Sequence, residues 1–234
     1  MLKTTNHVWM SSLALLLFTL ATRTLAANQA QDPTHASATS SRGSPVSVQV
    51  LSLLLVLGYT FGTERYARHG SKTARAVSDN SSRSTVITIV SATIFPFAGA
   101  LSLFDPLAMP PLPTVVVAFL FAVELFAIWL RYHSMHILGI YFTRSLKVQE
   151  GQRVIQSGPY AYIRHPGYLA NLLAFFAHAV LVSQNYGVFA IVFCAMAVVW
   201  SVRIDLEERM LVSELGAAYV AYQQRTKRLI PFVL

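Results

Sequence analysis

Apolar residues in this chain gather into long runs that short polar stretches separate. Helical segments cross a bilayer core with about 20 apolar residues, and the runs approach that length. The pattern predicts an all-α fold with about five core membrane helices, the second of them kinked at Pro96. The predicted helices cover residues 46–61, 85–104, 114–130, 168–182 and 186–202.

The last two runs are separated by Ser183, Gln184 and Asn185 alone, which predicts a tight antiparallel hairpin of helices. Beyond this hairpin, residues 205–228 carry apolar side chains at helical spacing among charged ones. That spacing is typical of an amphipathic helix, which we expect to lie at the membrane surface.

The first 45 residues differ from the rest of the chain. Residues 1–27 combine Lys3, an apolar run and a stretch of small residues, which is typical of a signal peptide or a signal anchor. Residues 28–45 are rich in Ser, Thr, Ala and Gln and contain too little apolar surface to fold, so we expect them to be disordered outside the cytoplasm. Residues 46–234 are predicted to form the transmembrane domain.

Composition strengthens the membrane prediction and fixes an expected orientation. Of the 234 residues, 54% are hydrophobic and 12% are charged, about half the charged share of a soluble domain. Lys and Arg gather in the segments 62–84, 131–167 and 203–228, whereas 105–113 and 183–185 contain none. By the positive-inside rule, the basic loops and the C-terminus face the cytoplasm. The net charge of +8 lies in these loops, which argues against nucleic acid as a partner.

Candidate chemistry lies at the cytoplasmic ends of the hairpin. Pro166 predicts that His165 lies at the start of a helix, and Gly158-Pro159-Tyr160 is typical of a turn. Arg203 and Glu207 are four residues apart, which places them on one face of a continuing helix, either as an ordinary ion pair or as part of a site.

Two other residues have competing interpretations. Glu124 stands inside an apolar run, where it pairs with Arg131, shapes a lipid path or makes an interhelical hydrogen bond. Cys194 is the single cysteine, and the spacing of His and Cys predicts no metal site. The chain also lacks GxGxxG and GxxxxGK[ST], which excludes a soluble methyltransferase of the Rossmann type.

The part of the chain from about residue 141 to 234 resembles the isoprenylcysteine carboxyl methyltransferase family of integral membrane methyltransferases. The matching motifs are GxxVIxxGPY from Gly151, YIRHPGY from Tyr162 and RxxxEExxL from Arg203. They are followed by GxxYxxY from Gly216 and by RLIPF from Arg228. Where the family usually has His, this chain has Gln152, and Asn171 replaces a more usual small residue.

The resemblance implies methyl transfer from S-adenosylmethionine to the C-terminal carboxylate of a prenylated cysteine. The implied catalytic residues are Arg203, which faces the substrate carboxylate, and Glu207, which accepts hydrogen bonds from the amino group of the cofactor with His165 nearby. The implied cofactor-binding residues are Gln152, Arg153, Val154, Ile155, Tyr160, His165, Pro166, Gly167, Tyr168 and Glu207.

Other functions stay open at this point. They are a phospholipid or other small-lipid methyltransferase, an NADPH-dependent sterol-type reductase of related architecture, and a non-catalytic membrane scaffold. The implied partners are prenylated protein C-termini or another lipid-linked acceptor, together with membrane lipid. The expected address is the endoplasmic reticulum membrane in a eukaryote and the inner membrane in a bacterium.

Overall fold

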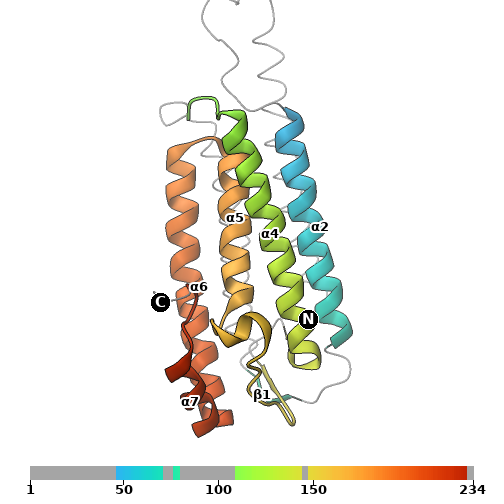
Figure 1. Cartoon of the computed structure of the whole chain (residues 1–234), viewed down its shortest axis with the longest axis vertical. Helices are drawn as coiled ribbons and strands as arrows, with labels where there is room; N and C mark the ends of the chain where they lie inside the picture. Colours follow the sequence, from blue (N-terminus) through green and yellow to red (C-terminus); the bar gives the residue numbers. More distant parts are fainter. Residues whose placement is uncertain (1–45, 71–75, 80–108, 144–146, 231–234) are drawn as a thin grey trace, which may run out of the picture.

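The computed structural model describes residues 46–70, 76–79, 109–143 and 147–230. Four long helices run side by side in it (Figure 1): α2 (Val46–Gly70), α4 (Thr114–Leu138), α5 (Pro166–Ser183) and α6 (Tyr186–Leu215). The predictions for residues 1–27, for residues 28–45 and for the second helix with Pro96 lie outside the described residues. The expected helical fold is confirmed for the part of the chain that is described.

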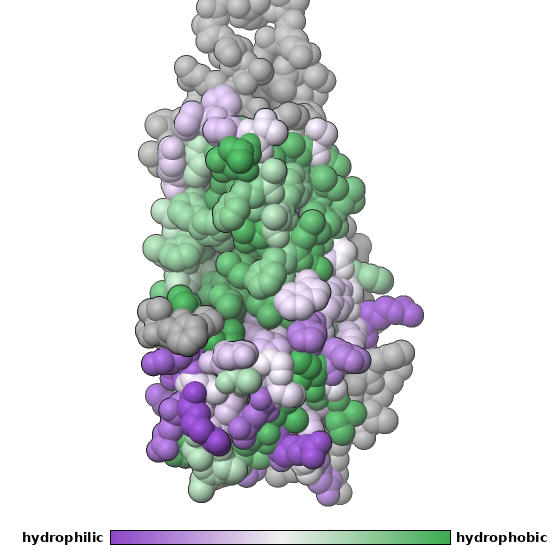
Figure 2. Space-filling view, in the orientation of Figure 1, coloured by the Kyte–Doolittle hydropathy of each residue, from purple (hydrophilic) through white to green (hydrophobic). Residues whose placement is uncertain are grey.

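Three of these helices have the length and composition to cross a membrane. They are α4 with its 3-10 extension η2 (Gly139–Tyr141), α5 and α6, and α2 adds a shorter apolar stretch, Ser47–Thr63. Figure 2 shows hydrophobic residues over the body of the bundle and hydrophilic residues gathered at the end where α7 lies. The protein is therefore a multi-pass membrane protein.

Helix α5 is the centre of the bundle, because it packs against α2, α4 and α6. Its sequence suits this place: Ala170, Ala174 and Ala177 are fully buried and recur at helical spacing along one face. Small residues let helix backbones approach closely in a membrane, where apolar side chains gain little from association alone.

The predicted hairpin is confirmed, with α5 ending at Ser183 and α6 beginning at Tyr186. Gln184 adopts the left-handed conformation with φ of 45°, and this reverses the chain. The Asn185 side chain then accepts a hydrogen bond of 3.1 Å from the backbone N–H of Val188 and caps α6.

The predicted boundary near residue 202 is wrong, because α6 continues to Leu215. Its 30 residues span about 45 Å at a rise of about 1.5 Å per residue. That is longer than the hydrocarbon core of about 30 Å, so the last turns extend beyond the apolar layer. The expected tail helix over 205–228 is accordingly divided: α6 ends at Leu215, Gly216 follows with a φ of 57°, and α7 (Ala217–Arg225) begins after it.

Two elements at the end of the bundle where α7 lies were not predicted from the sequence. Strands β1 (Ala76–Asp79) and β2 (Lys147–Gln149) pair antiparallel, with Ala76 opposite Gln149 and Asp79 opposite Lys147. They are too short to produce an alternation that stands out in the sequence. The turn expected at Gly158 is the 3-10 helix η3 (Gly158–Ala161).

Glu124 lies in a buried polar cluster within the bundle. Ser52 of α2 donates to its Oε1 at 3.0 Å, and His178 of α5 has Nδ1 3.9 Å from the same oxygen. Nδ1 of His178 is also 2.9 Å from the Ser52 hydroxyl, so the three residues join α2, α4 and α5. Of the interpretations left open by the sequence, the interhelical hydrogen bond is confirmed, whereas Arg131 is not the partner of Glu124.

Candidate functional site

The site lies at the polar end of the bundle, where local sequence shapes the entry to α5. Gly158 has φ of 59°, and a Cβ there would stand 2.3 Å from Cδ1 of Ile137, so both backbone and space favour glycine. His165 is the residue before the helix and Pro166 is its first helical residue, as predicted. After this turn, the Arg-His-Pro motif contacts α6 and the C-terminal segment.

Arg203, Tyr168 and Glu207 form a chain of hydrogen bonds between α5 and α6. The Arg203 Nε donates to the Tyr168 hydroxyl at 2.8 Å, and that hydroxyl donates to Oε2 of Glu207. Arg203 is buried, and its guanidinium carbon lies 5.8 Å from the centre of the Tyr168 ring. The expectation that Arg203 and Glu207 share a helix face is confirmed, and Tyr168 is the residue on which they meet.

Trp200 extends this group along α6. Its ring lies 4.9 Å from the ring of Tyr168. Its Nε1 is buried and has no hydrogen-bond partner among the described residues. The group therefore contains an anion, a cation, two aromatic faces and one unused N–H donor.

His165 lies near this group, as the resemblance implies, with its ring centre 5.5 Å from that of Tyr168. Its Nε2 lies 3.1 Å from Oε1 of Glu208, the residue after Glu207, and the side chains of His165 and Glu208 are both buried. Neighbouring residues on a helix point about 100° apart, so the two carboxylates of the acidic pair face different surroundings.

Tyr160 is buried close to the Arg203–Tyr168–Glu207 group. Burial raises its pKa, and the charges of Arg131 and Glu207 are close enough to shift that pKa further, in opposite directions. Its backbone oxygen accepts a hydrogen bond of 2.7 Å from the hydroxyl of Tyr222 in α7. Burial raises the pKa of Tyr222 to about 12, so this donor keeps its proton at neutral pH.

Residues 152–155 make local contacts in the structure. The Gln152 side chain accepts a hydrogen bond of 2.9 Å from the backbone N–H of Gln149, and Arg153 is exposed. Within the described residues, no hydrogen bond joins Gln152, Arg153, Val154 or Ile155 to Tyr168 or Glu207. The structure thus brings Tyr160, Tyr168, Arg203 and Glu207 together, and in the part of the chain that it describes it joins them to none of residues 152–155 by a hydrogen bond.

Two contacts at this end of the bundle were not predicted from the sequence. A Cβ on Gly167 would meet Nη1 of Arg131 at 2.4 Å, so the bare glycine gives room to that guanidinium. Asn171 accepts a hydrogen bond from the Tyr59 hydroxyl of α2, which explains a polar residue where a small one is more usual. Both contacts join residues from different helices, and spacing within one helix gives no sign of them.

Comparison with known proteins shows which family this part of the chain resembles. Residues 117–213 match the model of the isoprenylcysteine carboxyl methyltransferase (ICMT) family. The match begins within α4, earlier than the motifs after residue 141 on which the resemblance rested.

Two curated proteins are similar to parts of the chain. Protein-S-isoprenylcysteine O-methyltransferase of Schizosaccharomyces pombe is 32% identical over 113 residues, which cover 41% of this chain and 46% of that protein. Methanethiol S-methyltransferase 1 of Bradyrhizobium diazoefficiens is 36% identical over 74 residues, covering 31% of this chain and 24% of that protein. The chain thus spans less than half the length of either relative.

Among solved structures, the eukaryotic intramembrane Ras methyltransferase ICMT is similar, with a TM-score of 0.46 and 22% identity. That likeness covers 67% of this chain and 55% of the other. Methyltransferases of the family use S-adenosylmethionine. Through residues 117–213, the chain is therefore similar to the isoprenylcysteine carboxyl methyltransferase family of integral membrane methyltransferases.

Proposed function

We propose that this protein transfers a methyl group from S-adenosylmethionine to the carboxylate of a lipid-linked acceptor, with a C-terminal prenylcysteine as the acceptor. The observation that carries the proposal is the partly buried chain of hydrogen bonds from Arg203, which is itself buried, through the Tyr168 hydroxyl to Glu207. It places a cation and an anion on one aromatic residue at the polar end of a membrane bundle. An anionic acceptor and a donor with an ammonium group need those two charges.

The side chains present fit the donor. S-adenosylmethionine has an ammonium group, a positively charged sulfur and an adenine ring, which suit a carboxylate, an aromatic face and an N–H donor respectively. Glu207, Tyr168 and the unpartnered Nε1 of Trp200 provide these groups side by side. We assign its binding to Gln152, Arg153, Val154, Ile155, Tyr160, His165, Pro166, Gly167, Tyr168 and Glu207, and the donor supplies a methyl group on a cationic sulfur.

The protein's own task in this reaction is to bind and orient. A carboxylate is already ionised at neutral pH, so the site needs no general base. Arg203 binds the carboxylate through its guanidinium, and the bond from Nε to Tyr168 fixes the plane of that guanidinium. Arg203 is buried and Glu207 is half-buried, so water has limited access to the two charges, and the rate gain comes from positioning.

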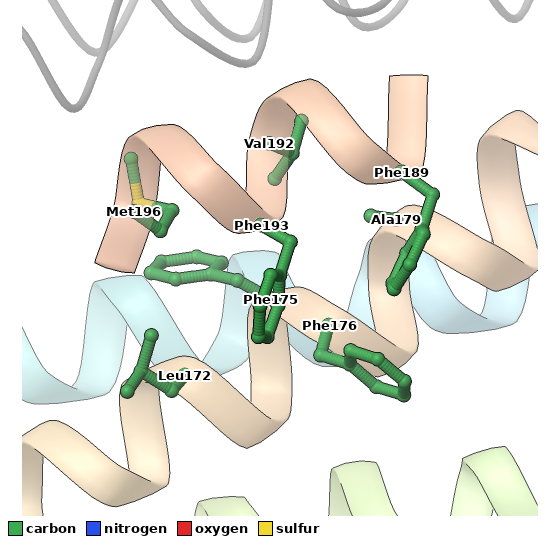
Figure 3. A pocket seen from close by; sticks show the side chains of 8 residues that line it. All are labelled: Leu172, Phe175, Phe176, Ala179, Phe189, Val192, Phe193 and Met196. Atoms are coloured by element: carbon green, nitrogen blue, oxygen red, sulfur yellow. The ribbon is translucent and has the colours of Figure 1, made fainter. Parts of the chain in front are cut away.

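An apolar pocket supports an acceptor with a hydrocarbon chain. Figure 3 shows side chains from α5 and α6 lining it, among them Leu172, Phe175 and Met196. Trp200 packs against a buried apolar cluster that includes Met196, one of the residues that line the pocket. Trp200 also contacts Tyr168. The pocket and the charged group are therefore linked through one side chain.

A small thiol is the second candidate acceptor, and similarity to the methanethiol methyltransferase favours it. A thiol must lose its proton before it becomes a good nucleophile, whereas a carboxylate is ready. No hydrocarbon chain would then be needed in the pocket between α5 and α6. The product would also differ, as a thioether resists alkali and a methyl ester does not.

We place the site and the C-terminus in the cytoplasm, on the distribution of Lys and Arg among the loops. The membrane is the endoplasmic reticulum in a eukaryotic host and the inner membrane in a bacterial one. A cytoplasmic site is within reach of a soluble methyl donor and of protein tails anchored by lipid.

The test is transfer of labelled methyl from S-adenosylmethionine by purified protein in lipid to N-acetyl-S-farnesylcysteine and, separately, to methanethiol. Alkali-labile label on the farnesyl compound, lost in R203A and E207A, is the expected result. Label in a volatile thioether alone would replace the acceptor by a thiol. Binding of the donor with neither product would direct the search to phospholipids, and no binding at all would favour the reductase or the scaffold.

A further inference from the structure

Glu208 is buried, and the resemblance gives it no role in the site. Its neighbour Glu207 contacts Tyr168, but Glu208 points toward the loop before α5 and toward the C-terminal segment. Its side chain is 6% exposed, and a buried carboxylate persists only when its charge is fully compensated. The residues that compensate it indicate what it does.

Both oxygens of this carboxylate are occupied. Oε1 accepts from Arg164 Nε at 2.7 Å and lies 3.1 Å from His165 Nε2. Oε2 accepts from Arg228 Nη2 at 2.9 Å and Nε at 3.2 Å, and from Gln223 Nε2 at 3.2 Å. One side chain of α6 thus holds the loop before α5, helix α7 and the segment after it.

The backbone follows the same arrangement. Residues 226–228 run beside 162–165, with a parallel bridge between Ile163 and Lys227. The N–H of Arg164 donates to the Lys227 oxygen at 2.7 Å, and the N–H of His165 donates to the Arg228 oxygen at 3.1 Å. The C-terminal segment therefore fixes the backbone of His165, the residue that precedes α5, three positions before Tyr168.

Arg164 ties this arrangement to α7 as well. Its Nη1 donates to the backbone oxygens of Gln223, at 3.0 Å, and Thr226. A guanidinium at the C-terminal end of a helix satisfies carbonyls that have no partner within the helix. Without the Glu208 carboxylate, this nearly buried cation would lose its counter-charge, and we expect it to move toward water.

We infer that Glu208 is a positioning residue: it holds His165 and the C-terminal segment 226–228 in the arrangement that binds the methyl donor. This inference rests on the proposed function, because His165 and Tyr168 line the donor pocket there. It separates the acidic pair into Glu207, which binds the ammonium group of the methyl donor, and Glu208, which fixes the residues around the donor.

The test compares E208Q with D205N in full-length protein purified in lipid or detergent. Asp205 also binds Arg228, at 2.9 Å, but both side chains are more than two-fifths exposed, so its loss should matter little. The first readout is trypsin cleavage after Lys227 and Arg228, which needs no donor. The second is the KM for S-adenosylmethionine alongside kcat.

We expect E208Q to be cleaved faster and to raise that KM about tenfold or more, because His165 and segment 226–228 would no longer be held in the arrangement that positions the donor. The fall in kcat should be smaller, since Arg203 and Glu207 keep their contacts with Tyr168. D205N should match the wild type in both readouts. E208D keeps the charge but shortens its reach, and an intermediate KM in a folded protein is expected even if E208Q fails to fold.

Wild-type values of KM in E208Q or E208D would overturn the inference. Faster cleavage with an unchanged KM would do so as well, because Glu208 would then fix the tail without affecting the donor. A wild-type protein that binds no S-adenosylmethionine would overturn the proposed function itself. That failure is distinct from one in which wild type and variant bind the donor equally well.

Discussion

The hydroxyl group of Tyr168 joins two side chains of opposite charge. The four-residue spacing of Arg203 and Glu207 was enough to predict that they share a face of α6. The residue on which they meet lies on another helix, and the family motif, rather than any spacing, drew attention to Tyr168. The same reason explains why Glu208 and Arg131 were missed, since their contacts cross between elements.

Y168F tests this hydroxyl while keeping the ring. The substitution removes the acceptor for Arg203 Nε and the donor to Glu207. A hydrogen bond to a charged group contributes about 1.5–3 kcal/mol, so we expect kcat/KM to fall by about ten- to a hundredfold. The measurement is the initial rate of methyl transfer at several donor concentrations.

Y162F is the matched control, because Tyr162 belongs to the same motif but is 66% exposed. It should keep the wild-type rate. Equal rates for Y168F and the wild type would mean that Arg203 is oriented by other contacts and that the chain of hydrogen bonds is not needed.

At the scale of the element, helix starts were easier to predict than helix ends. Thr114 and Tyr186 begin α4 and α6 where the apolar runs begin, whereas both helices continue well past the apolar residues. Hydropathy reports where a helix leaves the apolar layer, and a helix has no physical reason to stop there. The end of α6 is set by Gly216 and its positive φ, a signal that lies beyond the charged cluster.

The packing of α5 on its neighbours gives a second prediction. A174L places a large side chain where the residue is fully buried in the centre of the bundle. Overpacking of this kind costs about 1–3 kcal/mol, so the unfolding midpoint in detergent should fall. Thermal unfolding followed by circular dichroism measures it.

A190L makes the same change on α6, at an exposed position of the apolar surface. We expect an unfolding midpoint close to that of the wild type, since the added side chain contacts lipid or detergent. If both variants are equally stable, Ala174 does not lie in a tight helix contact. The predicted role of small residues in α5 would then be wrong.

At the scale of the whole molecule, the two ends of the bundle differ, because the hydrophilic residues gather at the end where α7 lies. The charged cluster, α7 and the β1–β2 ladder lie at one end, and the α5–α6 connection lies at the other (Figure 1). This division was predictable, because a hairpin returns the chain to the level where it started. Which end faces the cytoplasm depends on loop charge, a property of membrane insertion rather than of folding.

Cysteine labelling decides that orientation. In a C194A background, which removes the single cysteine, Q224C marks exposed α7 and Y186C marks the exposed start of α6. With intact bacterial cells that carry the protein in the inner membrane, a membrane-impermeant maleimide should label Y186C, and Q224C should react only after that membrane is opened. This follows from the excess of Lys and Arg at the end that holds α7. The reverse pattern would place the site outside the cytoplasm, away from soluble methyl donor, and would contradict both the orientation and the proposed reaction.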